Sequence, residues 1–332
     1  MSAPVVVAVV SHDSAADLPG CLGAVGRLEP PPAELVVVDC ASHDASVETA
    51  RAHLPASVAA ARLLPLGENR GFAGGTNAAI AASFSPWILT LNPDAEPEPD
   101  YLGRLLARAG TSAEPPAGAL TGRLLRRRAA EEPQRLDACG MRLARAWRHF
   151  DRGAGEFDHG QYGVAERVFG ATGAASLWRR AALEDVAVDG EWFDERFHSY
   201  REDAELCFRL RERGWEILYE PSARAVHGRR VLPERRREMP AAVNLHSLKN
   251  RYLLRCGHQS AANLLRTLPW TLPRDLGALL WVLAVERGSL GAYGWLWRHR
   301  KEIRARRRQL RARRTAPPAA VERWFAITGE PL

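Results

Sequence analysis

The side chains of this sequence that could do chemistry begin with two adjacent carboxylates, Glu202 and Asp203, at the predicted start of a helix that ends near Gly214. His227 follows at the end of a short apolar run, behind the next predicted strand (215–219). A carboxylate that accepts a proton beside a histidine that binds a metal would suit general-base catalysis. Acids in the first turn of a helix also complement its dipole. This stretch by itself therefore leaves a catalytic and a purely structural interpretation open.

The strands and helix predicted earlier in the sequence indicate where a ligand would bind. The continuous apolar runs 5–10 and 35–38 are typical of strands buried on both faces, and the pattern over 17–28 predicts a helix between them. Strand, helix and strand in this order predict a right-handed unit that opens a doubly wound α/β domain. Ligands of such sheets bind beyond the carboxyl ends of the strands. Three polar side chains fall there: Ser11, Asp39 and Asp44.

A glycine-rich segment, residues 69–77, precedes a predicted alanine-rich helix over 78–83. Glycines let the backbone approach a ligand closely, and free N–H groups at a helix start suit phosphate. The segment matches neither the dinucleotide-binding fingerprint nor a P-loop, so alone it is weak support for a nucleotide site.

Asp94 follows a predicted strand, 87–91, and a proline that stiffens the turn. A carboxylate in this position would suit a hard cation that bridges phosphates. The alternative is an Asx turn that leads into a helix predicted over 99–109.

The middle of the chain is less informative. Residues 111–160 carry no clear pattern, and we expect Arg126–Arg128 and residues 153–163 to form a mobile, exposed insertion. Small residues return over 169–180, as in the lining of a pocket.

The overall charge limits the classes of partner. The net charge is +7, and the 46 basic residues include only two lysines. This balance suits nucleic acid, anionic lipid or phosphate-bearing substrates. Nothing besides charge favours nucleic acid, because zinc-finger spacing and an RNP-type aromatic motif are both missing from the sequence. Five cysteines without a C-x-x-C pair indicate reduced thiols in a cytosolic setting.

We place a domain boundary near residue 235, with a catalytic domain over 1–235 and a helical, Arg/Trp-rich region over 236–332. We expect neither a secretory signal nor a spanning helix, because the longest apolar stretch, 276–285, is shorter than the ~20 residues required. Tryptophans interleaved with leucines and followed by arginines predict a helix on an anionic membrane surface. The alternative is a helical cap on the catalytic domain.

Five motifs in order resemble family 2 of the inverting glycosyltransferases, most closely bacterial rhamnosyltransferases, over residues 4–255. The motifs are Val37-Val-Asp39 with Ser42-x-Asp44-x-Ser46, Asn69-Arg-Gly-Phe-Ala-Gly-Gly-Thr-Asn77, Leu91-Asn-Pro-Asp94, Gly173-Ala174, and Arg201-Glu-Asp-Ala-Glu-Leu-Cys-Phe-Arg209 with His227. The resemblance implies the GT-A fold, a Rossmann-like α/β domain with a mixed sheet. It also implies a nucleotide-diphosphate sugar donor and a divalent cation, Mg²⁺ or Mn²⁺.

The resemblance also implies the roles of individual residues. Asp203 matches the catalytic base, with Glu202 in support, and Asp94 and His227 match the metal–diphosphate site. Asp39 matches the residue that contacts the nucleotide base. The residues assigned to the donor are Ser11, Asp39, Asp44, Arg70, Gly71, Gly74, Asn77, Asn92 and Asp94. The residues assigned to the acceptor are Gly173, Ala174, Asn250 and Arg251. The sequence departs from the family pattern at Cys40, Asn92 and Glu205.

The function implied is inverting transfer of a sugar, rhamnose by preference, to a saccharide or a polyprenyl-diphosphate-linked acceptor in cell-envelope polysaccharide synthesis. A galactofuranosyl-, hexosyl- or hexosaminyltransferase of the same family is the alternative, and a basic nucleic-acid-binding protein is the alternative from another class. We expect a cytoplasmic enzyme, peripheral on the inner face of the cytoplasmic membrane, that does not bind nucleic acid.

Overall fold

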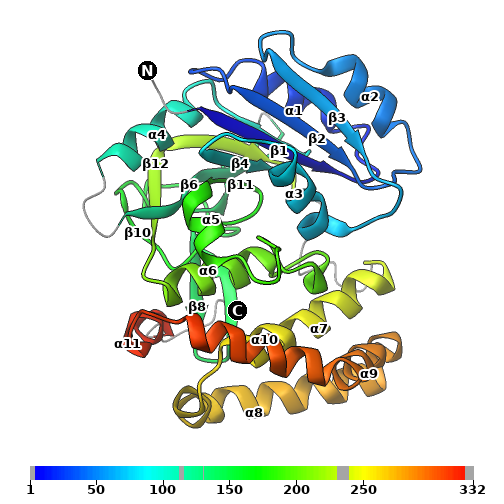
Figure 1. The fold of residues 1–332 in the computed structure, drawn as a ribbon, viewed down its shortest axis with the longest axis vertical. Coiled ribbons are helices and arrows are strands. Elements are labelled where there is room, and N and C mark those ends of the chain that lie inside the picture. The colour runs from blue at the N-terminus through cyan, green and yellow to red at the C-terminus, as the bar shows by residue number, and fades with distance from the viewer. Residues whose placement is uncertain (1–3, 112–115, 130, 230–238, 326–332) are drawn as a thin grey trace.

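The computed structural model describes residues 4–111, 116–129, 131–229 and 239–325. A central sheet carries helices on both faces, and further helices from the end of the chain pack beneath it (Figure 1). The strands are β1 (Val5–Ser11), β2 (Glu34–Asp39), β3 (Ala60–Pro65), β4 (Trp87–Leu91), β5 (Ala95–Pro97), β6 (Ala117–Arg126), β7 (Leu136–Ala138), β8 (Met141–Ala144), β9 (Arg148–Asp151), β10 (Glu166–Arg167), β11 (Ala175–Arg179) and β12 (Glu216–His227). The helices are α1 (Leu18–Val25), α2 (Ser46–His53), α3 (Gly71–Ala81), α4 (Tyr101–Gly110), α5 (Arg180–Val186), α6 (Glu202–Glu212), α7 (Ala241–His258), α8 (Ala261–Ala284), α9 (Gly291–Arg298), α10 (Arg300–Arg313) and α11 (Pro318–Glu322). Short 3₁₀ turns lie at Glu195–Phe197, Arg287–Leu290 and Arg323–Phe325.

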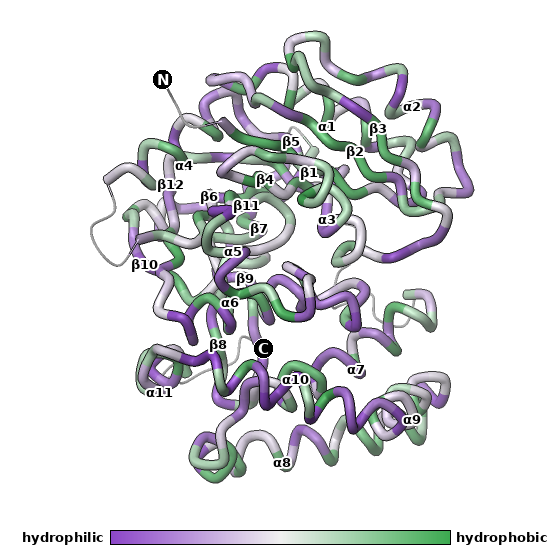
Figure 2. Tube along the Cα trace, in the orientation of Figure 1, coloured by the Kyte–Doolittle hydropathy of each residue, from purple (hydrophilic) through white to green (hydrophobic). Residues whose placement is uncertain are grey.

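The main sheet is mixed, in the order β10-β12-β6-β11-β4-β1-β2-β3. β3, β2, β1 and β4 run parallel, whereas β11 is antiparallel to both β4 and β6. The alternation of β1 explains its unbroken apolar run: Val5, Val7 and Val9 pack under α1, α2 and α4, and Val6 and Val10 pack under α3, α5 and α6. β1 and β2 are accordingly coloured mainly as hydrophobic along the trace (Figure 2). The predicted doubly wound α/β class with a mixed sheet is confirmed.

Three sequence-based expectations need correction. The stretch 111–160, which shows no clear pattern in the sequence, contributes β6, a central strand whose first eight residues are buried, together with β7, β8 and β9. Arg126, expected in an exposed insertion, is the last residue of β6. β6 escaped notice because glycines and polar residues interrupt its apolar pattern. Helix α3 begins at Gly71 rather than at residue 78. β12 is one strand up to His227, with an irregularity around Pro221, which has no N–H to donate.

The C-terminal helices rest against the catalytic half of the molecule. The expected boundary near residue 235 lies outside the described residues. α10 packs on α7, and Arg306 of α10 reaches Asp194 at 3.1 Å. Trp147 donates from its indole N–H to Asn263 Oδ1 of α8 at 2.7 Å. Within the described ranges, every helix is too short or too polar to cross a bilayer.

A buried ionic cluster joins these helices to α6. The imidazole of His258, at the end of α7, lies 3.4 Å from Glu205 and 3.1 Å from Glu212, and its exposed fraction is 1%. Glu205 also pairs with Arg209 at 2.8 Å. Burial lowers the pKa of His258, but the two carboxylates raise it to about 9. Position 205, where the family pattern more often has Asp, thus holds a side chain that reaches both Arg209 and His258.

We predict that this cluster makes stability depend on pH. A histidine whose folded pKa exceeds its unfolded value stabilises fully below the unfolded pKa, and that contribution is lost as pH rises through the folded pKa. The window therefore runs from 6.5 to about 9. His258→Gln should lower the unfolding free energy by roughly 3 kcal/mol at pH 6 and flatten its decline over this window. Urea denaturation at several pH values measures both effects.

The matched control is His53→Gln, because His53 is exposed on α2. Equal pH dependence in the wild type and His258→Gln would show that the buried imidazole is not the group responsible.

Candidate active site

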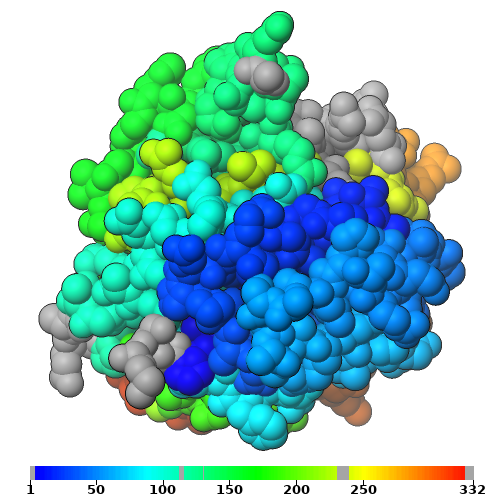
Figure 3. All heavy atoms as spheres, turned by 90° about the horizontal axis from the view of Figure 1, so that it is seen from above, coloured from blue at the N-terminus to red at the C-terminus, as the bar shows by residue number. Residues whose placement is uncertain are grey.

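The predicted functional side chains meet at one edge of the sheet because of strand direction. Ser11 and Asp39 end the parallel strands β1 and β2 and pair in register. Asp94 follows β4, and His227, the last residue of β12, lies opposite Ala95 of β5. β11 runs antiparallel to β4, so the residues just before it reach the same edge. Figure 3 shows from above that the first part of the chain (blue to cyan) lies beside the segment that contains β6 to β11 (green).

Asp94 and His227 form a buried pair. His227 Nε2 lies 3.2 Å from Asp94 Oδ1 and 3.2 Å from the Asn92 amide. On the other side of the ring, Nδ1–H donates to Asp137 Oδ2 at 2.7 Å. Asp137 is held in turn by Arg229 at 2.9 Å. A carboxylate on Nδ1 fixes the tautomer that leaves the Nε2 lone pair for a cation.

The electrostatics of this pair fit a cation. Burial lowers the pKa of His227, but hydrogen bonds to Asp137 and Asp94 raise it to about 9, so a proton is strongly attracted to Nε2. A position that attracts a proton between an imidazole and a carboxylate oxygen has the donor chemistry for a divalent cation. We therefore find Asp94 and His227 suited to hold Mg²⁺ or Mn²⁺.

The two adjacent carboxylates at the start of α6 have different environments. Asp203 Oδ2 accepts from the backbone N–H of Gly173 at 2.9 Å, and Oδ1 accepts from the N–H of Ala204 at 2.7 Å. Burial raises the pKa of Asp203 to about 6 although these bonds lower it. Burial and the nearby Asp203 charge raise the pKa of Glu202 well above its ordinary value. Of the two, Asp203 is the one whose pKa of about 6 leaves it ionised near neutral pH, whereas the environment of Glu202 favours its neutral form.

A loop in left-handed conformation positions this pair. His198, Tyr200 and Arg201 have φ values of 64°, 72° and 77°, an arrangement that costs roughly 1–3 kcal/mol per residue. The side-chain amide of Asn250 holds the loop by donating to the carbonyls of Phe197, Ser199 and Tyr200 at 2.7–2.9 Å. Asn250 is fully buried. Its contact with an acceptor stays a prediction, and the structure gives it this positioning role.

The glycine-rich segment differs from the expectation of free N–H groups. The N–H of Ala73 donates to the His198 carbonyl, and the N–H of Phe72 to Ser199 Oγ. Gly71 has a φ of 64°, and a Cβ there would lie 2.3 Å from the His198 carbonyl oxygen. Gly71 therefore leaves room for the loop that contains His198. The N–H groups of Phe72 and Ala73 already have hydrogen-bond partners within the protein.

The other residues of this segment that the resemblance assigns to the donor contact residues 193–195, just before the His198–Arg201 loop. Arg70 Nη2 contacts both carboxylate oxygens of Glu195 at 2.6 and 2.7 Å, and the Asn77 amide reaches Glu195 and the backbone of Phe193. A Cβ at Gly74 would lie 2.5 Å from the Arg70 Cβ. Their binding of donor stays a prediction.

The loops after β1 and β2 are tied together. Asp39 accepts twice from Ser42, and Asp44 accepts from the N–H groups of Ala15 and Ser46. The hydroxyl of Ser11 is buried with no hydrogen-bond partner among the described residues. These contacts fix the place where a nucleotide was predicted to bind.

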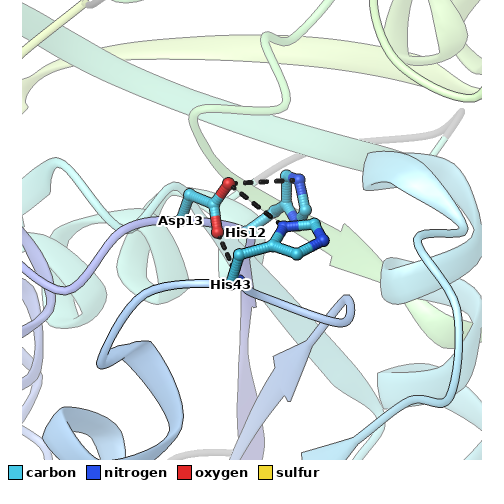
Figure 4. A group of neighbouring side chains, drawn as sticks. All are labelled: His12, Asp13 and His43. Carbon is cyan, nitrogen blue, oxygen red and sulfur yellow. Dashed lines mark hydrogen bonds and ion pairs between the residues drawn. The ribbon is translucent and has the colours of Figure 1, made fainter.

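A histidine–aspartate group at the same edge was not singled out from the sequence. His12, Asp13 and His43 bring one ligand atom each to within 4.8 Å of one another (Figure 4). His12 Nδ1 lies 2.9 Å from the Cys40 carbonyl, and the N–H of His43 donates to Asp13 Oδ1 at 2.7 Å. The group therefore adds to the contacts that join the two loops.

The remaining acceptor-assigned residues lie on two sides of the base. Gly173 orients Asp203, and the Ala174 carbonyl accepts from the N–H of Asn92 at 2.9 Å. Arg251 is buried and pairs with Asp275 of α8 at 2.5 Å. Asp137, Arg229 and Glu195 are the site residues that sequence reasoning missed, because isolated charged residues in unpatterned segments carry no local signal.

The chain is similar in sequence to known proteins. Residues 6–186 match the Glycosyl transferase family 2. The chain is 28% identical over 325 residues to the N-acetylglucosaminyl-diphospho-decaprenol L-rhamnosyltransferase of Mycobacterium tuberculosis (strain CDC 1551 / Oshkosh), covering 92% of this chain and 96% of that protein.

Solved structures share the fold. The mannosyltransferase PcManGT from Pyrobaculum calidifontis in complex with GDP-Man and Mn²⁺ superposes with a TM-score of 0.53 at 18% identity, over 94% of this chain and 86% of that one. GalNAc-T7 with UDP, GalNAc and Mn²⁺ gives a TM-score of 0.59 at 13% identity, over 76% of this chain and 48% of that one, about half its length. The predicted GT-A fold is confirmed.

We predict that Asp137 controls cation binding without touching the cation. Asp137→Asn should weaken Mn²⁺ binding in the presence of a nucleoside diphosphate by about 10–100-fold, because the His227 tautomer is no longer fixed. Asp94→Ala and His227→Ala should each weaken it at least as much, with the double variant little worse than the worse single one. Isothermal titration of Mn²⁺ measures these affinities.

Asp151→Asn is the matched control, because Asp151 pairs with Arg229 at 2.9 Å, as Asp137 does, but is not hydrogen-bonded to His227. If the Asp137→Asn variant binds Mn²⁺ as tightly as the wild type, the cation does not bind at Asp94 and His227.

Proposed function

We propose, from the premise that this chain belongs to glycosyl transferase family 2, that it is an inverting, cation-dependent enzyme acting on a nucleotide-diphosphate sugar. The sugar that we favour is rhamnose, and the acceptor is a saccharide or a polyprenyl-diphosphate-linked saccharide. Support for the acceptor is the 28% identity, over nearly the whole chain, to a mycobacterial rhamnosyltransferase named for a diphospho-decaprenol substrate. The observation that carries the proposal is the environment of Asp203.

Asp203 is suited to be the base. An acceptor hydroxyl has a pKa far above 7, so a carboxylate must take its proton as the oxygen attacks the anomeric carbon. A pKa of about 6 leaves Asp203 ionised at neutral pH yet more basic than an ordinary aspartate. The N–H of Gly173 holds one carboxylate oxygen, which fixes the direction of the other. The bond from the anomeric carbon to the diphosphate breaks in the same displacement.

The state of Glu202 supports inversion. A retaining route through a covalent intermediate needs an ionised carboxylate as nucleophile. Glu202 is buried and its pKa is raised well above the ordinary value, so its environment disfavours the ionised form that a nucleophile needs. One displacement with Asp203 as the base inverts the anomeric centre.

Asp94 and His227 would hold the cation, with Asp137 behind the imidazole. When bound, the divalent cation supplies positive charge that neutralises the leaving nucleoside diphosphate. Asp39, Ser11 and the tied loops around them form the edge that we assign to the nucleoside, as the strand ends of this fold class suggest.

The donor sugar stays open among family members. Galactofuranosyl, hexosyl and hexosaminyl transfer are the alternatives to rhamnosyl transfer, and a panel of sugar nucleotides read by nucleoside diphosphate release decides among them. The nucleic-acid alternative gains nothing from the structure. Much of the arginine run contacts the protein itself: Arg306 pairs with Asp194, Arg307 donates to the Cys256 and Gln259 carbonyls, and Arg314 pairs with Glu212.

We place the enzyme in the cytoplasm, on the inner face of the cytoplasmic membrane. Both sequence interpretations of the C-terminal region have support. α7 and α10 pack as a cap, whereas α8 exposes large apolar side chains to solvent. Leu265, Leu280 and Leu276 are exposed by 73%, 66% and 52%. A helix face of this kind in a protein of high positive charge suits an anionic lipid surface.

The test of the catalytic assignment is a pH profile. We predict that kcat/KM falls below a pH of about 6, as Asp203 takes up its proton. Asp203→Asn should reduce transfer by at least ~10²-fold with donor binding intact. Glu202→Gln should cost far less, because burial and the Asp203 charge already favour the neutral form of Glu202. NMR of the product reports the anomeric configuration, and a retained configuration, or equal mild losses in both variants, would refute the mechanism.

The membrane location predicts salt-sensitive flotation. The wild type should float with anionic vesicles at low salt and detach as salt screens the charges. Leu276→Glu with Leu280→Glu should abolish flotation. Val164→Glu, an equally drastic change at a residue of the catalytic half that is 73% exposed, should not. Wild-type protein that stays in the soluble fraction with anionic and neutral vesicles would make α8 part of a cap only.

A further inference from the structure

A cavity of about 270 Å³ lies between α7 and α8, apart from the donor edge. Three arginines from different segments line it: Arg201 just before α6, Arg251 of α7 and Arg274 of α8. Leu248, Trp281 and Val282 form its apolar wall. We call this cavity the arginine pocket.

The arginine pocket brings three guanidinium groups to one place. Among the residues that the structure describes, its lining includes no acidic side chain. The nearby carboxylate of Asp275 is shared between Arg251 and Arg255, at 2.5 Å from each. Arg251 Nε is buried with no hydrogen-bond partner among the described residues. Guanidinium groups match phosphate oxygens in pairs, so a lining of this kind favours such an anion.

A buried histidine lies beside these arginines. The imidazole of His149 lies 3.1 Å from Arg201 Nη1. Burial lowers the pKa of His149 well below its ordinary value, and the charges of Arg201, Arg148 and Arg274 lower it further. The neutral imidazole therefore adds no positive charge of its own beside the arginine pocket.

The surroundings of the arginine pocket indicate what kind of anion fits. Arg201 directly precedes the catalytic pair Glu202–Asp203 and belongs to the loop that Asn250 holds. Trp281 lines the pocket and is also 36% exposed, so the apolar wall reaches the surface of α8. Exposed leucines continue along that helix on both sides of it: Leu272, Leu276, Leu279, Leu280 and Leu283. A ligand with an anionic group and a long apolar chain would satisfy both surfaces.

We infer that the arginine pocket binds the diphosphate of a lipid-linked acceptor, with the lipid chain along α8 and the sugar end toward Asp203. The inference rests on the proposed function, because it names the site of that acceptor. It adds Arg201, Arg274 and Trp281 to the acceptor residues, and it gives Arg251 a specific partner.

Farnesyl diphosphate is a soluble probe of this chemistry, and calorimetric titration into the full chain tests the inference. The wild type should bind it, and Arg251→Gln and Arg274→Gln should each weaken binding by at least about tenfold, as loss of a charge-assisted contact does. Inorganic pyrophosphate should bind more weakly than farnesyl diphosphate and lose affinity in the same variants. Pyrophosphate that binds as tightly as farnesyl diphosphate would overturn the lipid part of the inference.

Arg255→Gln is the matched control. Arg255 pairs with the same Asp275 carboxylate but does not line the pocket, so this variant should bind farnesyl diphosphate normally. Equal losses in Arg255→Gln and Arg251→Gln would overturn the inference. Arg251→Lys keeps the charge and the fold if Arg251→Gln is unstable, and it should show an intermediate affinity.

Two further readings separate this inference from the proposed function. Nucleoside diphosphate affinity should be unchanged in the arginine variants. If farnesyl diphosphate binds at the pocket but no sugar nucleotide supports transfer, the proposed function fails and the pocket stands. If transfer to an acceptor without a diphosphate proceeds and no variant changes farnesyl diphosphate binding, the pocket is wrong and the function stands.

Discussion

The loop from His198 to Arg201 keeps its left-handed backbone because residues on two sides of it hold it in place. On one side, Gly71 lacks the Cβ that would collide with the His198 carbonyl, and the N–H of Ala73 donates to that carbonyl. On the other side, the buried amide of Asn250 donates to three carbonyls of the loop. The donor-side helix α3, the base at the start of α6 and the C-terminal helix α7 therefore share one fixed segment. Arg201, the last residue of that segment, extends the same linkage to the arginine pocket.

Burial of charge sets the chemistry of the site. Removing a carboxylate from water raises its pKa, and nearby hydrogen-bond donors decide how far. Asp203 receives two backbone N–H groups, whereas one oxygen of Glu202 has no hydrogen-bond partner in the described part of the chain. Two adjacent acids of similar intrinsic strength thus differ in pKa, and Asp203 is the one that its surroundings leave suited to act as a base. Nearby charges also set the state of two histidines. His227 and His258 each lie between two carboxylates, which favour the protonated imidazole.

The C-terminal helices combine two roles that the sequence presented as alternatives. α7 and α10 are bound to the catalytic half through buried ion pairs, which suits a cap. α8 contacts the catalytic half through Asn263 and Arg274, but it also exposes leucines that no described element covers. An acceptor anchored in a membrane would bring its charged group to the junction between these two parts, where the arginine pocket lies.

The sequence by itself determined the parts of the protein that depend on local order. Apolar periodicity located the parallel strands β1, β2 and β4, and strand direction placed Asp39 and Asp94 at one edge. Motif order indicated the family, and the resemblance assigned the role of base to Asp203. The tertiary structure decided the rest: that β6 is a central strand, that Asp137 supports His227 from 90 residues away, and that Glu195 holds Arg70 across 125 residues. Periodicity reports only which face of an element is buried. Partners of isolated charged residues follow from how the elements pack, and a pKa follows from those partners and from burial, so neither can be read from neighbours along the chain.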